Sequence, residues 1–399
     1  RLDTPESRWQ AMLGIWWRTH FYLYYQCRPE RDLLTQYGEY MHRVMASIYP
    51  QWAQPLTMPS SDHNGRIRVG YVSSFFRDHV IARMMLGWLK HRDRAQFEIY
   101  SYYTGTTVDR MTHQFRQHSD RFHHPGNNLE AVCHQMRADD LHILVFTDIG
   151  MEPLMSQLAS LRLAPVQCAA WGHPVTTGIP TIDYFLSSDH MEPENAASHY
   201  SETLIRLPNT GLCYARPEVP PQTHTRQNFG LRPEAIVYLC SQSLFKYLPQ
   251  YDYLFPAIAQ QVPNAQFAFL GLQDSSIVEK FRQRLHRVFA AAGLDSQDYC
   301  FIVPRQKQLG YWGLNGVSDV LLDSLGWSGG NTVFDAIACQ LPVVTCPGEL
   351  MRGRHAYGIL QSMGMTSTIA SCEADYIAIA VQLGLDPDYR AQIRQEQQE

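Results

Sequence analysis

The residues best suited to chemistry are gathered in one glycine-rich segment of the chain. A predicted strand ends near Asp323, a flexible turn follows, and a helix begins near Asn331 or Thr332. The N–H groups of a first helical turn and the positive end of the helix dipole both attract a phosphate. Gly329 and Gly330 allow the backbone to approach such a ligand closely. The full segment reads Asp323-Ser-Leu-Gly-Trp-Ser-Gly-Gly-Asn-Thr332-Val-Phe-Asp335.

Asp335 lies one turn into this predicted helix, where a carboxylate can bind the two hydroxyls of a ribose. The alternative is an ordinary capped helix after a strand, with Asp335 only favouring the helix dipole. The pattern alone does not decide between these interpretations, because glycine-rich turns are common.

Lys246 lies just after the predicted strand 237–241, in the segment Ser241-Gln-Ser-Leu-Phe-Lys-Tyr247, in a chain that is poor in lysine. A compact ammonium group at the carboxyl end of a strand can neutralise a leaving diphosphate. The alternative is a solvated surface lysine, which is the commoner situation for this residue type.

His79 and Asp148 follow two further predicted strands, 67–73 and 141–147. His79 is placed to act as a general base or to contact a substrate, and Asp78 beside it can fix its tautomer. Alternatively, Asp78 caps a helix and His79 is exposed. Asp148 is a second candidate base, or else a helix N-cap before Glu152.

The segment Gly172-His-Pro-Val-Thr-Thr-Gly178 follows the predicted strand 167–171 and offers hydroxyls and an imidazole to a sugar. The alternative is a tight loop in which Thr176 and Thr177 cap their neighbours. Its candidate ligand contacts are Gly172, His173 and Pro174.

Arg305 follows the predicted strand 301–304, and Tyr311 and Trp312 come shortly after it. An aromatic ring here can stack on a nucleotide base. A buried position on a helix is the alternative, and it is favoured for Trp312.

These residues are positioned by short apolar runs that alternate with stretches of helical spacing, which predicts parallel sheets covered by helices. The first series of strands is expected at 67–73, 97–103, 141–147, 167–171, 183–186 and 204–207, with helices at 80–92, 108–118, 128–138 and 153–161. A second series follows a proline-rich linker at 214–233, with strands at 237–241, 267–271, 301–304, 320–323 and 343–346 and helices at 250–262, 276–293, 308–317, 331–340 and 354–363.

The fold class is therefore α/β, with two doubly wound domains expected to face a cleft. The domains are predicted at 65–230 and 231–399, after a helical cap or repeat-like segment at 1–64. In that segment Trp9, Trp16, Trp17 and Tyr22–Tyr25 suggest one amphipathic helix, and the spacing from Leu33 to Ile48 suggests a second.

Composition excludes several broad classes of protein. The 399 residues are 45% hydrophobic and 18% charged, which is typical of a globular chain of two or three domains. No run approaches the roughly 18 apolar residues of a membrane helix. The net charge of −5 and the absence of a long basic block argue against nucleic acid as a partner. No initiator Met or signal-peptide pattern opens the sequence, so we expect it to begin inside a longer protein.

The nine cysteines form no C-x-x-C pair and mostly lie in apolar runs. We therefore expect reduced, buried thiols in a cytoplasmic protein and no metal site.

Six short words in register resemble the catalytic region of glycosyltransferase family 41, from about Arg66 to Met365. That family includes protein O-GlcNAc transferases, SPINDLY-type relatives and bacterial cytoplasmic N-glucosyltransferases. The words are Arg66-Ile-Arg-Val-Gly-Tyr-Val-Ser-Ser74, Leu163-Ala-Pro-Val-Gln167 with Trp171-Gly-His-Pro174, Ile182-Asp-Tyr184, Tyr200-Ser-Glu202 with Arg206-Leu-Pro208, Ser328-Gly-Gly-Asn-Thr332, and Leu341-Pro-Val-Val-Thr345 with Pro347-Gly-Glu349.

The resemblance implies a GT-B fold and an inverting, metal-independent transfer from a UDP-sugar to a protein or peptide side chain. It also implies a role for each matched residue. Lys246 and the segment Gly330–Thr332 match the diphosphate contacts, and Asp335 matches the ribose-binding residue. His79 matches a base or acceptor contact, while Gly172 and Pro174 match the loop beside the sugar. Residues 1–64 resemble the junction between tetratricopeptide repeats and the catalytic region.

Several positions depart from the family pattern. Ser243 stands where O-GlcNAc transferases carry Gln, Tyr311 stands where a base-stacking His is expected, and Gly330-Asn-Thr332 replaces a common His-Thr-Thr. The first loop reads Phe75-Phe-Arg-Asp-His79, where the family often has Asp-Phe-Gly-x-His. These departures leave the donor sugar, GlcNAc or glucose, and the acceptor, Ser/Thr or Asn, open.

No cofactor is expected beyond the donor substrate, and neither a membrane nor a nucleic acid is an expected partner. Three alternatives remain: a GDP-fucose-dependent protein O-fucosyltransferase, a nucleotide-sugar 2-epimerase and a non-catalytic repeat-protein scaffold. Lys246 together with Asp335 argues mildly against the scaffold.

Overall fold

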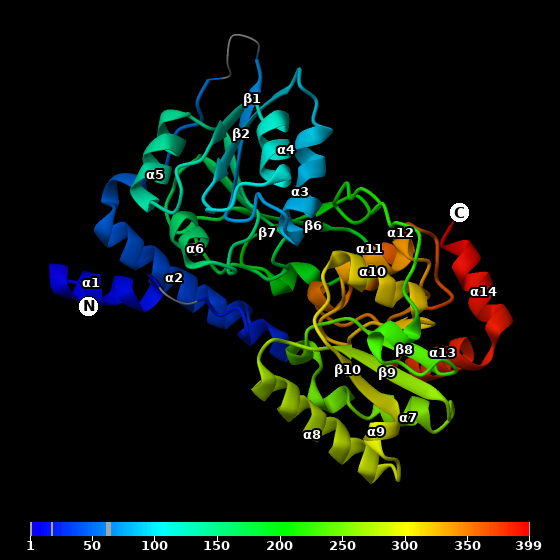
Figure 1. The fold of residues 1–399 in the computed structure, drawn as a ribbon. Helices are drawn as coiled ribbons and strands as arrows, with labels where there is room; N and C mark the ends of the chain where they lie inside the picture. The colour runs from blue at the N-terminus through cyan, green and yellow to red at the C-terminus, as the bar shows by residue number, and fades with distance from the viewer. Residues whose placement is uncertain (1, 17–18, 61–64, 399) are drawn as a thin grey trace. The chain divides into compact units, whose positions relative to one another are not determined.

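The computed structural model describes residues 2–16, 19–60 and 65–398. They form two compact units (Figure 1). The first unit comprises Arg1–Tyr24 and Arg28–Ala215, and the second comprises Tyr25–Cys27 and Arg216–Glu399. Trp17, which the sequence places in the first predicted helix, lies outside the described residues.

The first unit is built on a seven-stranded, all-parallel sheet with the strand order β3-β2-β1-β4-β5-β6-β7. The order reverses between β1 and β4, as expected of a doubly wound sheet. The strands are β1 Ile67–Ser73, β2 Phe97–Tyr103, β3 Arg121–His123, β4 Ile143–Phe146, β5 Val166–Ala170, β6 Tyr184–Ser188 and β7 Thr203–Leu207.

Helices α3 to α6 connect the strands from β1 to β5, and the sequence predicts these helices to within a few residues. Parallel neighbours require such crossover connections. A stacked pair of rings, Phe76 and Phe115, with centroids 4.1 Å apart, marks the core beneath α3 and α4. The helices of the unit are α1 Pro5–Trp16, α2 Arg31–Ile48, α3 Val80–Lys90, α4 Arg110–His118, α5 Leu129–Ala138 and α6 Pro153–Ala159, with short 3-10 turns at Pro50–Trp52 and Ala196–His199.

The second unit repeats the architecture with five parallel strands in the order β10-β9-β8-β11-β12. Here the order reverses between β8 and β11. The strands are β8 Ile236–Cys240, β9 Ala265–Leu270, β10 Cys300–Val303, β11 Val320–Leu322 and β12 Val343–Val344.

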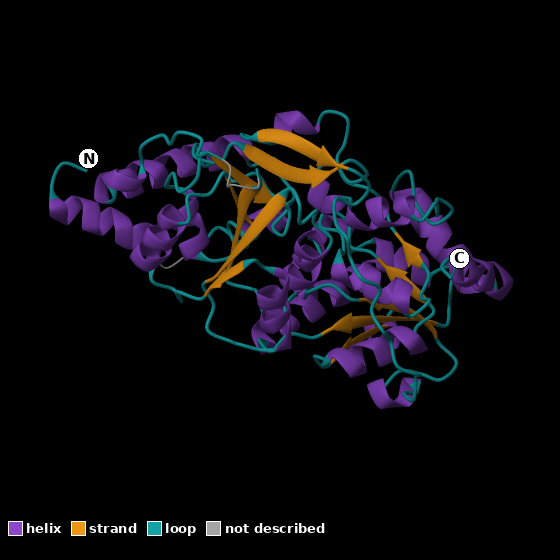
Figure 2. Cartoon of the chain, turned by 90° about the horizontal axis from the view of Figure 1, so that it is seen from above, coloured by secondary structure: helices purple, strands orange, loops and turns teal. Residues whose placement is uncertain are grey.

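Aromatic packing dominates the core of the second unit. Phe255 and Phe281 from two helices pack edge-on against Phe269 of β9, at centroid distances of 5.1 and 5.0 Å. In Figure 2 the orange strands of this sheet are flanked by purple helices. The helices are α7 Leu254–Ala259, α8 Ser275–Ala291, α9 Ser296–Tyr299, α10 Gln308–Val317, α11 Asn331–Ala338, α12 His355–Ser362, α13 Glu373–Leu385 and α14 Pro387–Glu396.

The N-terminal segment corrects one sequence prediction. Instead of one helix running to Tyr25, α1 ends at Trp16 and a separate 3-10 turn covers Leu23–Gln26. Trp9 is 59% exposed, and the buried side of α1 carries Met12 and Ile15 instead. The second predicted helix is confirmed as α2.

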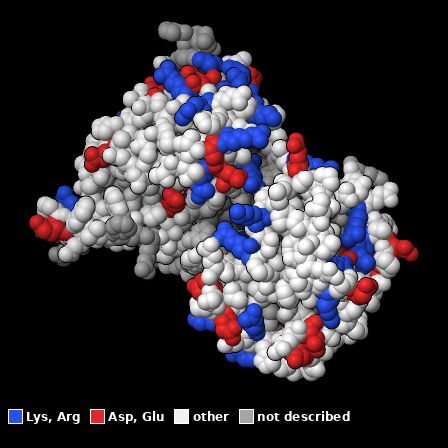
Figure 3. Space-filling view, viewed as in Figure 1, with Lys and Arg blue, Asp and Glu red and all other residues white. Residues whose placement is uncertain are grey.

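Three further expectations can be compared with the described residues. No described helix is long and apolar enough to cross a membrane. All nine cysteines are without a disulfide, but only Cys133, Cys168 and Cys240 are fully buried. Basic and acidic side chains both occur over the face shown in Figure 3.

Candidate functional site

The candidate residues of each unit lie at the strand ends where the sheet order reverses. In doubly wound sheets, ligands bind outside the carboxyl ends of the strands at this point. In the first unit these are the ends of β1 and β4, followed by His79 and Asp148. In the second unit they are the ends of β8 and β11, followed by Lys246 and the glycine-rich segment.

A chain of hydrogen bonds joins Lys246 to the start of α11. The Lys246 Nζ donates to Gln242 Oε1 at 2.8 Å, and Gln242 Nε2 donates to Thr332 Oγ1 at 2.6 Å. The two strand-end loops are thereby fixed to each other, with the ammonium at one end of the chain and the helix start at the other. We call this the Lys246–Gln242–Thr332 relay.

The electrostatics of Lys246 follow from its surroundings. Burial lowers the pKa of its ammonium to about 8, and the charge of Asp323 opposes that shift. Burial also raises the pKa of Asp323 to about 6, although its carboxylate accepts hydrogen bonds from Ser328 Oγ, the Gly329 N–H and Thr345 Oγ1. At neutral pH the ammonium of Lys246 is therefore mostly charged, and the nearby carboxylate of Asp323 is mostly ionised.

The start of α11 has no side-chain cap. Gly330 is the N-cap residue. A Cβ at Gly329 would lie 2.3 Å from Thr332 Oγ1 and 2.5 Å from Gln242 Nε2. Only glycine therefore fits beside the relay, which is a packing reason for this residue.

Asp335 is buried and already holds two hydrogen bonds. Its Oδ1 accepts from the Trp312 indole N–H at 2.8 Å, and its Oδ2 accepts from Asn331 Nδ2 at 2.8 Å. Asn331 therefore directs its side chain to Asp335. Tyr311 lies on α10, close enough to Asp335 for the two groups to interact. Burial raises the pKa of its phenol, and the negative charge of Asp335 raises it further.

Ser243 and Arg305 differ in how the structure places them. Ser243 precedes the short turn Leu244–Lys246, and its carbonyl accepts the Lys246 backbone N–H at 2.9 Å. Arg305 is exposed beyond β10, two strands away from β8, and no described contact joins it to the relay.

Sequence reasoning missed several residues around Lys246. Its Nζ lies 5.8 Å from the ring centroid of Tyr25 and 5.6 Å from that of Trp327. The charge of Lys246 also helps to lower the pKa of His355 to about 4, after burial. Gln242 and Asp323 stand inside the segments that the sequence singled out, whereas Tyr25 gave no local signal.

In the first unit, His79 itself caps α3. Its Nδ1 accepts the Ile81 N–H at 3.3 Å, and its ring stacks on Phe75 with centroids 4.2 Å apart. Asp78 is exposed and pairs with Arg83 at 2.8 Å, so the predicted tautomer contact and the predicted Asp78 cap are both wrong.

The cap also defines what His79 can do chemically. Because Nδ1 accepts a hydrogen bond, the neutral ring carries its proton on Nε2. Burial, followed by the charges of Arg77 and Arg83, lowers the pKa of His79 to about 4. At neutral pH this ring is a hydrogen-bond donor at Nε2, and abstracting a proton there would require it to give up the cap.

Asp148 is fully buried and is not the predicted helix cap, since Glu152 holds that position before α6. Its Oδ1 accepts from Thr147 Oγ1 at 2.7 Å. Burial raises the pKa of its carboxyl to about 7, against the hydrogen bonds from Thr147 and Ser73. The group titrates near neutral pH but lies beneath the surface.

The loop after β5 is stabilised by contacts with other residues of the first unit. A Cβ at Gly172 would lie 2.1 Å from the carbonyl oxygen of Thr147, so this loop packs tightly on the end of β4. Thr176 donates to the buried carboxylate of Glu202 at 2.6 Å, and Thr177 donates to the same group. The two hydroxyls predicted for a sugar therefore bind Glu202, a residue whose role the sequence did not indicate.

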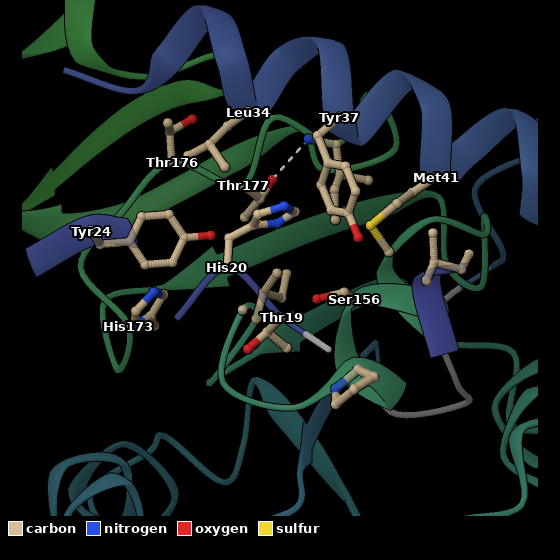
Figure 4. A pocket seen from close by; sticks show the side chains of 15 residues that line it. Thr19, His20, Tyr24, Leu34, Tyr37, Met41, Ser156, His173, Thr176 and Thr177 are labelled. Atoms are coloured by element: carbon tan, nitrogen blue, oxygen red, sulfur yellow. Dashed lines mark hydrogen bonds between the residues drawn. The ribbon is translucent and has the colours of Figure 1, made fainter. Parts of the chain in front are cut away.

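His173 faces the N-terminal segment of its unit. Its ring stacks on Phe21 at 5.5 Å and meets Tyr24 edge-on at 4.9 Å. Figure 4 shows it beside a cavity of about 30 Å³, which has room for water but not for a sugar. Pro174 next to it is buried.

The second unit also contains a cavity of about 640 Å³, a size typical of small-molecule sites. Leu325 and Gly326, which directly precede Trp327, line it together with Cys27, Tyr251 and Glu349. Among the described residues no group of three or more His, Cys, Asp or Glu side chains is arranged to hold a metal ion.

Comparison with known proteins identifies the family and the fold of the chain. The chain is 25% identical over 360 residues to a probable UDP-N-acetylglucosamine–peptide N-acetylglucosaminyltransferase SPINDLY of Solanum lycopersicum, covering 86% of this chain and 37% of the relative. It is 24% identical over 360 residues to a probable transferase of the same description, SEC of Arabidopsis thaliana, covering 86% and 36%. The chain thus spans less than two fifths of these relatives.

A solved structure of an O-GlcNAc transferase mutant from Thermobaculum terrenum superposes with a TM-score of 0.76 at 24% identity, covering 90% of this chain and 68% of that one. This likeness confirms the GT-B fold. The family model described as glycosyl transferase family 41 matches residues 44–214 and 213–399. The chain therefore belongs to glycosyl transferase family 41.

Proposed function

We propose that this protein transfers GlcNAc or glucose from a UDP-sugar to a Ser, Thr or Asn side chain of a protein, with inversion and without a metal ion. The observation that carries the proposal is the Lys246–Gln242–Thr332 relay, which fixes an ammonium group to the start of α11. Both features stabilise negative charge, and a nucleotide diphosphate is the leaving group on which such charge develops.

The proposed step is a single displacement at the anomeric carbon of the sugar. The acceptor oxygen or nitrogen forms a bond to this carbon on one face, and the bond to the diphosphate oxygen breaks on the other. The electron pair leaves with UDP, whose new charge meets Lys246 and the α11 N-terminus, and the acceptor proton passes to a base or to water. Inversion follows from attack opposite the leaving group.

In the second unit, we propose that Gly329, Gly330 and Thr332 approach the diphosphate, with Ser243 beside it. Asp335 and Tyr311 are proposed to meet the nucleoside, the first as the ribose contact and the second as the base contact. For Asp335 this requires the ribose to reach a carboxylate that is 1% exposed and already bound to Trp312. Arg305 stays a weaker candidate, because it is exposed and apart from the others.

The first unit is proposed to serve the acceptor. The Nε2–H of His79 can donate to an acceptor or sugar oxygen, so we assign it an orienting role. Asp148 is the alternative proton acceptor. Its pKa of about 7 suits proton transfer near neutral pH, but its carboxyl is fully buried and so is not accessible to an acceptor in this conformation. Gly172, His173 and Pro174 are proposed to shape the loop beside the sugar. His173 would stabilise this loop by packing on Phe21 and Tyr24.

The names of the relatives support a peptide acceptor and UDP-GlcNAc as the donor. The absence of disulfides among the nine cysteines favours a reducing compartment, and we propose the cytoplasm.

The test is calorimetric titration of the chain with UDP, GDP and dTDP, with and without EDTA. We expect UDP to bind equally well in EDTA and Lys246→Met to lose this binding. A preference for GDP would support the fucosyltransferase alternative. Turnover of free donor without a peptide would support an epimerase, and no binding of any nucleotide would support a scaffold.

A further inference from the structure

Tyr25 and Trp327 enclose Lys246 from two sides. The two ring centroids are 4.4 Å apart with the planes tilted by 56°, and the Lys246 Nζ lies within 6 Å of both. Ammonium groups at such distances are attracted to the negative faces of aromatic rings, most strongly where water is excluded. Both rings are buried, at 4% and 6% exposure. We call this pair the Tyr25–Trp327 slot.

The segment Tyr25–Cys27 belongs to the second unit, although Tyr24 and Arg28 on either side of it belong to the first. Tyr25 also packs on Phe245, next to Lys246 in sequence, with ring centroids 4.9 Å apart. These contacts make a residue from the N-terminal part of the chain a wall of the Lys246 site.

The backbone around Tyr25 is shaped to hold it there. Cys27 has a φ of +54°, a conformation that side chains other than glycine adopt only when the surroundings impose it. Its Sγ lies 2.5 Å from where a Cβ on Gly326 would be, and Gly326 itself has a φ of +87°. Cys27 thus packs closely against Gly326, so the backbone that follows Tyr25 contacts the residue directly before Trp327.

We propose that the Tyr25–Trp327 slot is a positioning element for Lys246, with Tyr25 directing the ammonium group toward the diphosphate of the donor. The role in donor binding rests on the proposed function. The role of holding the ammonium does not, and it can be measured without any ligand.

Three other groups face Lys246 and enter its titration. Asp323, which follows β11, stabilises the ammonium form, and His355 of α12 is neutral near pH 7 with its pKa lowered to about 4. Gln242 is uncharged and accepts a hydrogen bond from the ammonium. The Tyr25 variants leave these three residues unchanged in sequence, so we assign a change in the Lys246 titration to the loss of the Tyr25 ring.

The experiment is NMR titration of the protein with ¹³C-labelled lysine side chains. The sequence contains four lysines, so the spectrum is simple, and Lys246→Met assigns the signal. Tyr25→Leu keeps apolar bulk but removes the ring, so we expect the midpoint of Lys246 to fall by roughly half a pH unit or more. Tyr25→Phe keeps the ring face and should leave the midpoint in place.

The matched control is Tyr299→Leu, which breaks another ring pair of the second unit, with Phe289, where the centroids are 5.7 Å apart. It should lower stability without moving the Lys246 midpoint. The proposal that the slot positions Lys246 would be overturned if the titration midpoint of Lys246 were unchanged in Tyr25→Leu, or if it shifted equally in Tyr25→Phe. If Tyr25→Leu does not fold, magnetisation transfer between the Tyr25 ring and the Lys246 ε-methylene in the unmodified chain decides, and its absence overturns the proposal.

The same variants are then titrated with UDP. We expect Tyr25→Leu to bind roughly two- to tenfold more weakly, with Tyr25→Phe close to the unmodified chain. If the unmodified chain binds no UDP, the proposed function fails while the NMR result on the slot stands. If UDP binds equally to all variants while the midpoint shifts, the slot holds the ammonium but does not serve donor binding, and that part of the proposal is overturned.

Discussion

The two sheets present opposite chemistry at the same topological position. In the second unit, the strand ends at the reversal carry Lys246, bound through Gln242 to the start of a helix. In the first unit, the corresponding strand ends carry a neutral imidazole and a buried carboxyl, His79 and Asp148. The same topology thus places different side chains at corresponding strand ends, and we propose that the second unit binds a diphosphate while the first receives a hydroxyl or amide.

The largest expected effect comes from removing the charge of Lys246 in the second unit. Lys246→Met keeps the length of the side chain and removes the charge, so we expect the transfer rate to fall by roughly a hundredfold or more. Steady-state assays with a peptide acceptor measure this. Lys280→Met removes an exposed lysine of α8 and is the matched control. A Lys246→Met chain with an unchanged rate would falsify the assignment of charge stabilisation to the second unit.

In the first unit, substitutions of His79 can distinguish its role as the N-cap of α3 from its proposed role in orienting the acceptor. His79→Asn retains a good N-cap residue for α3 but removes the Nε2 donor, so we expect transfer to fall roughly tenfold to a hundredfold with UDP affinity unchanged. His79→Ala should in addition lose about 1 kcal/mol of stability through the cap. Loss of UDP affinity in His79→Asn would contradict the division of roles between the units.

The relay is tested by Gln242→Leu, which leaves the Lys246 ammonium without its 2.8 Å acceptor. A hydrogen bond to a charged group contributes about 1.5–3 kcal/mol, so UDP affinity should fall by about tenfold or more. Gln261→Leu, at an exposed position of the same unit, is the control. If the two variants bind UDP alike, the relay has no part in orienting Lys246.

The smallest expected effect is a pH dependence with opposite signs in the two units. Lys246 has a pKa of about 8, below its usual value, so it loses its charge above that pH and UDP affinity should decline there. Asp148 has a pKa of about 7, above its usual value. If it accepts the proton, the rate at saturating donor rises as the pH passes 7; if the proton passes to water instead, this rise is absent.

The sequence predicts the larger part of the fold because its signals are local. Apolar runs and helical spacing are set by neighbouring residues, and they place every strand of both sheets except the three-residue β3. The break after Trp16 was missed because the aromatic residues continue through Tyr25, and composition alone does not show where a helix ends.

The sequence singled out Lys246 and Gly329–Thr332 because each follows a predicted strand end, and the structure joins Lys246 to Thr332 through Gln242. The sequence did not indicate residues whose position depends on contacts between distant segments. Tyr25 meets Lys246 only in the folded chain, and Glu202 accepts hydrogen bonds from Thr176 and Thr177 of another loop. Polar residues near a strand end therefore do not show by themselves whether they face a ligand or a buried neighbour.

The most direct test of the central claim, that the Lys246 ammonium meets the donor diphosphate, is proton-linked calorimetry. UDP is titrated at pH 8.5 in buffers that differ in ionisation enthalpy. There Lys246 is partly uncharged and the phosphates of UDP are fully ionised, so binding should take up a fraction of a proton. We predict this uptake in the unmodified chain and its loss in any residual binding by Lys246→Met. Binding of UDP by the unmodified chain with no proton uptake would contradict the account.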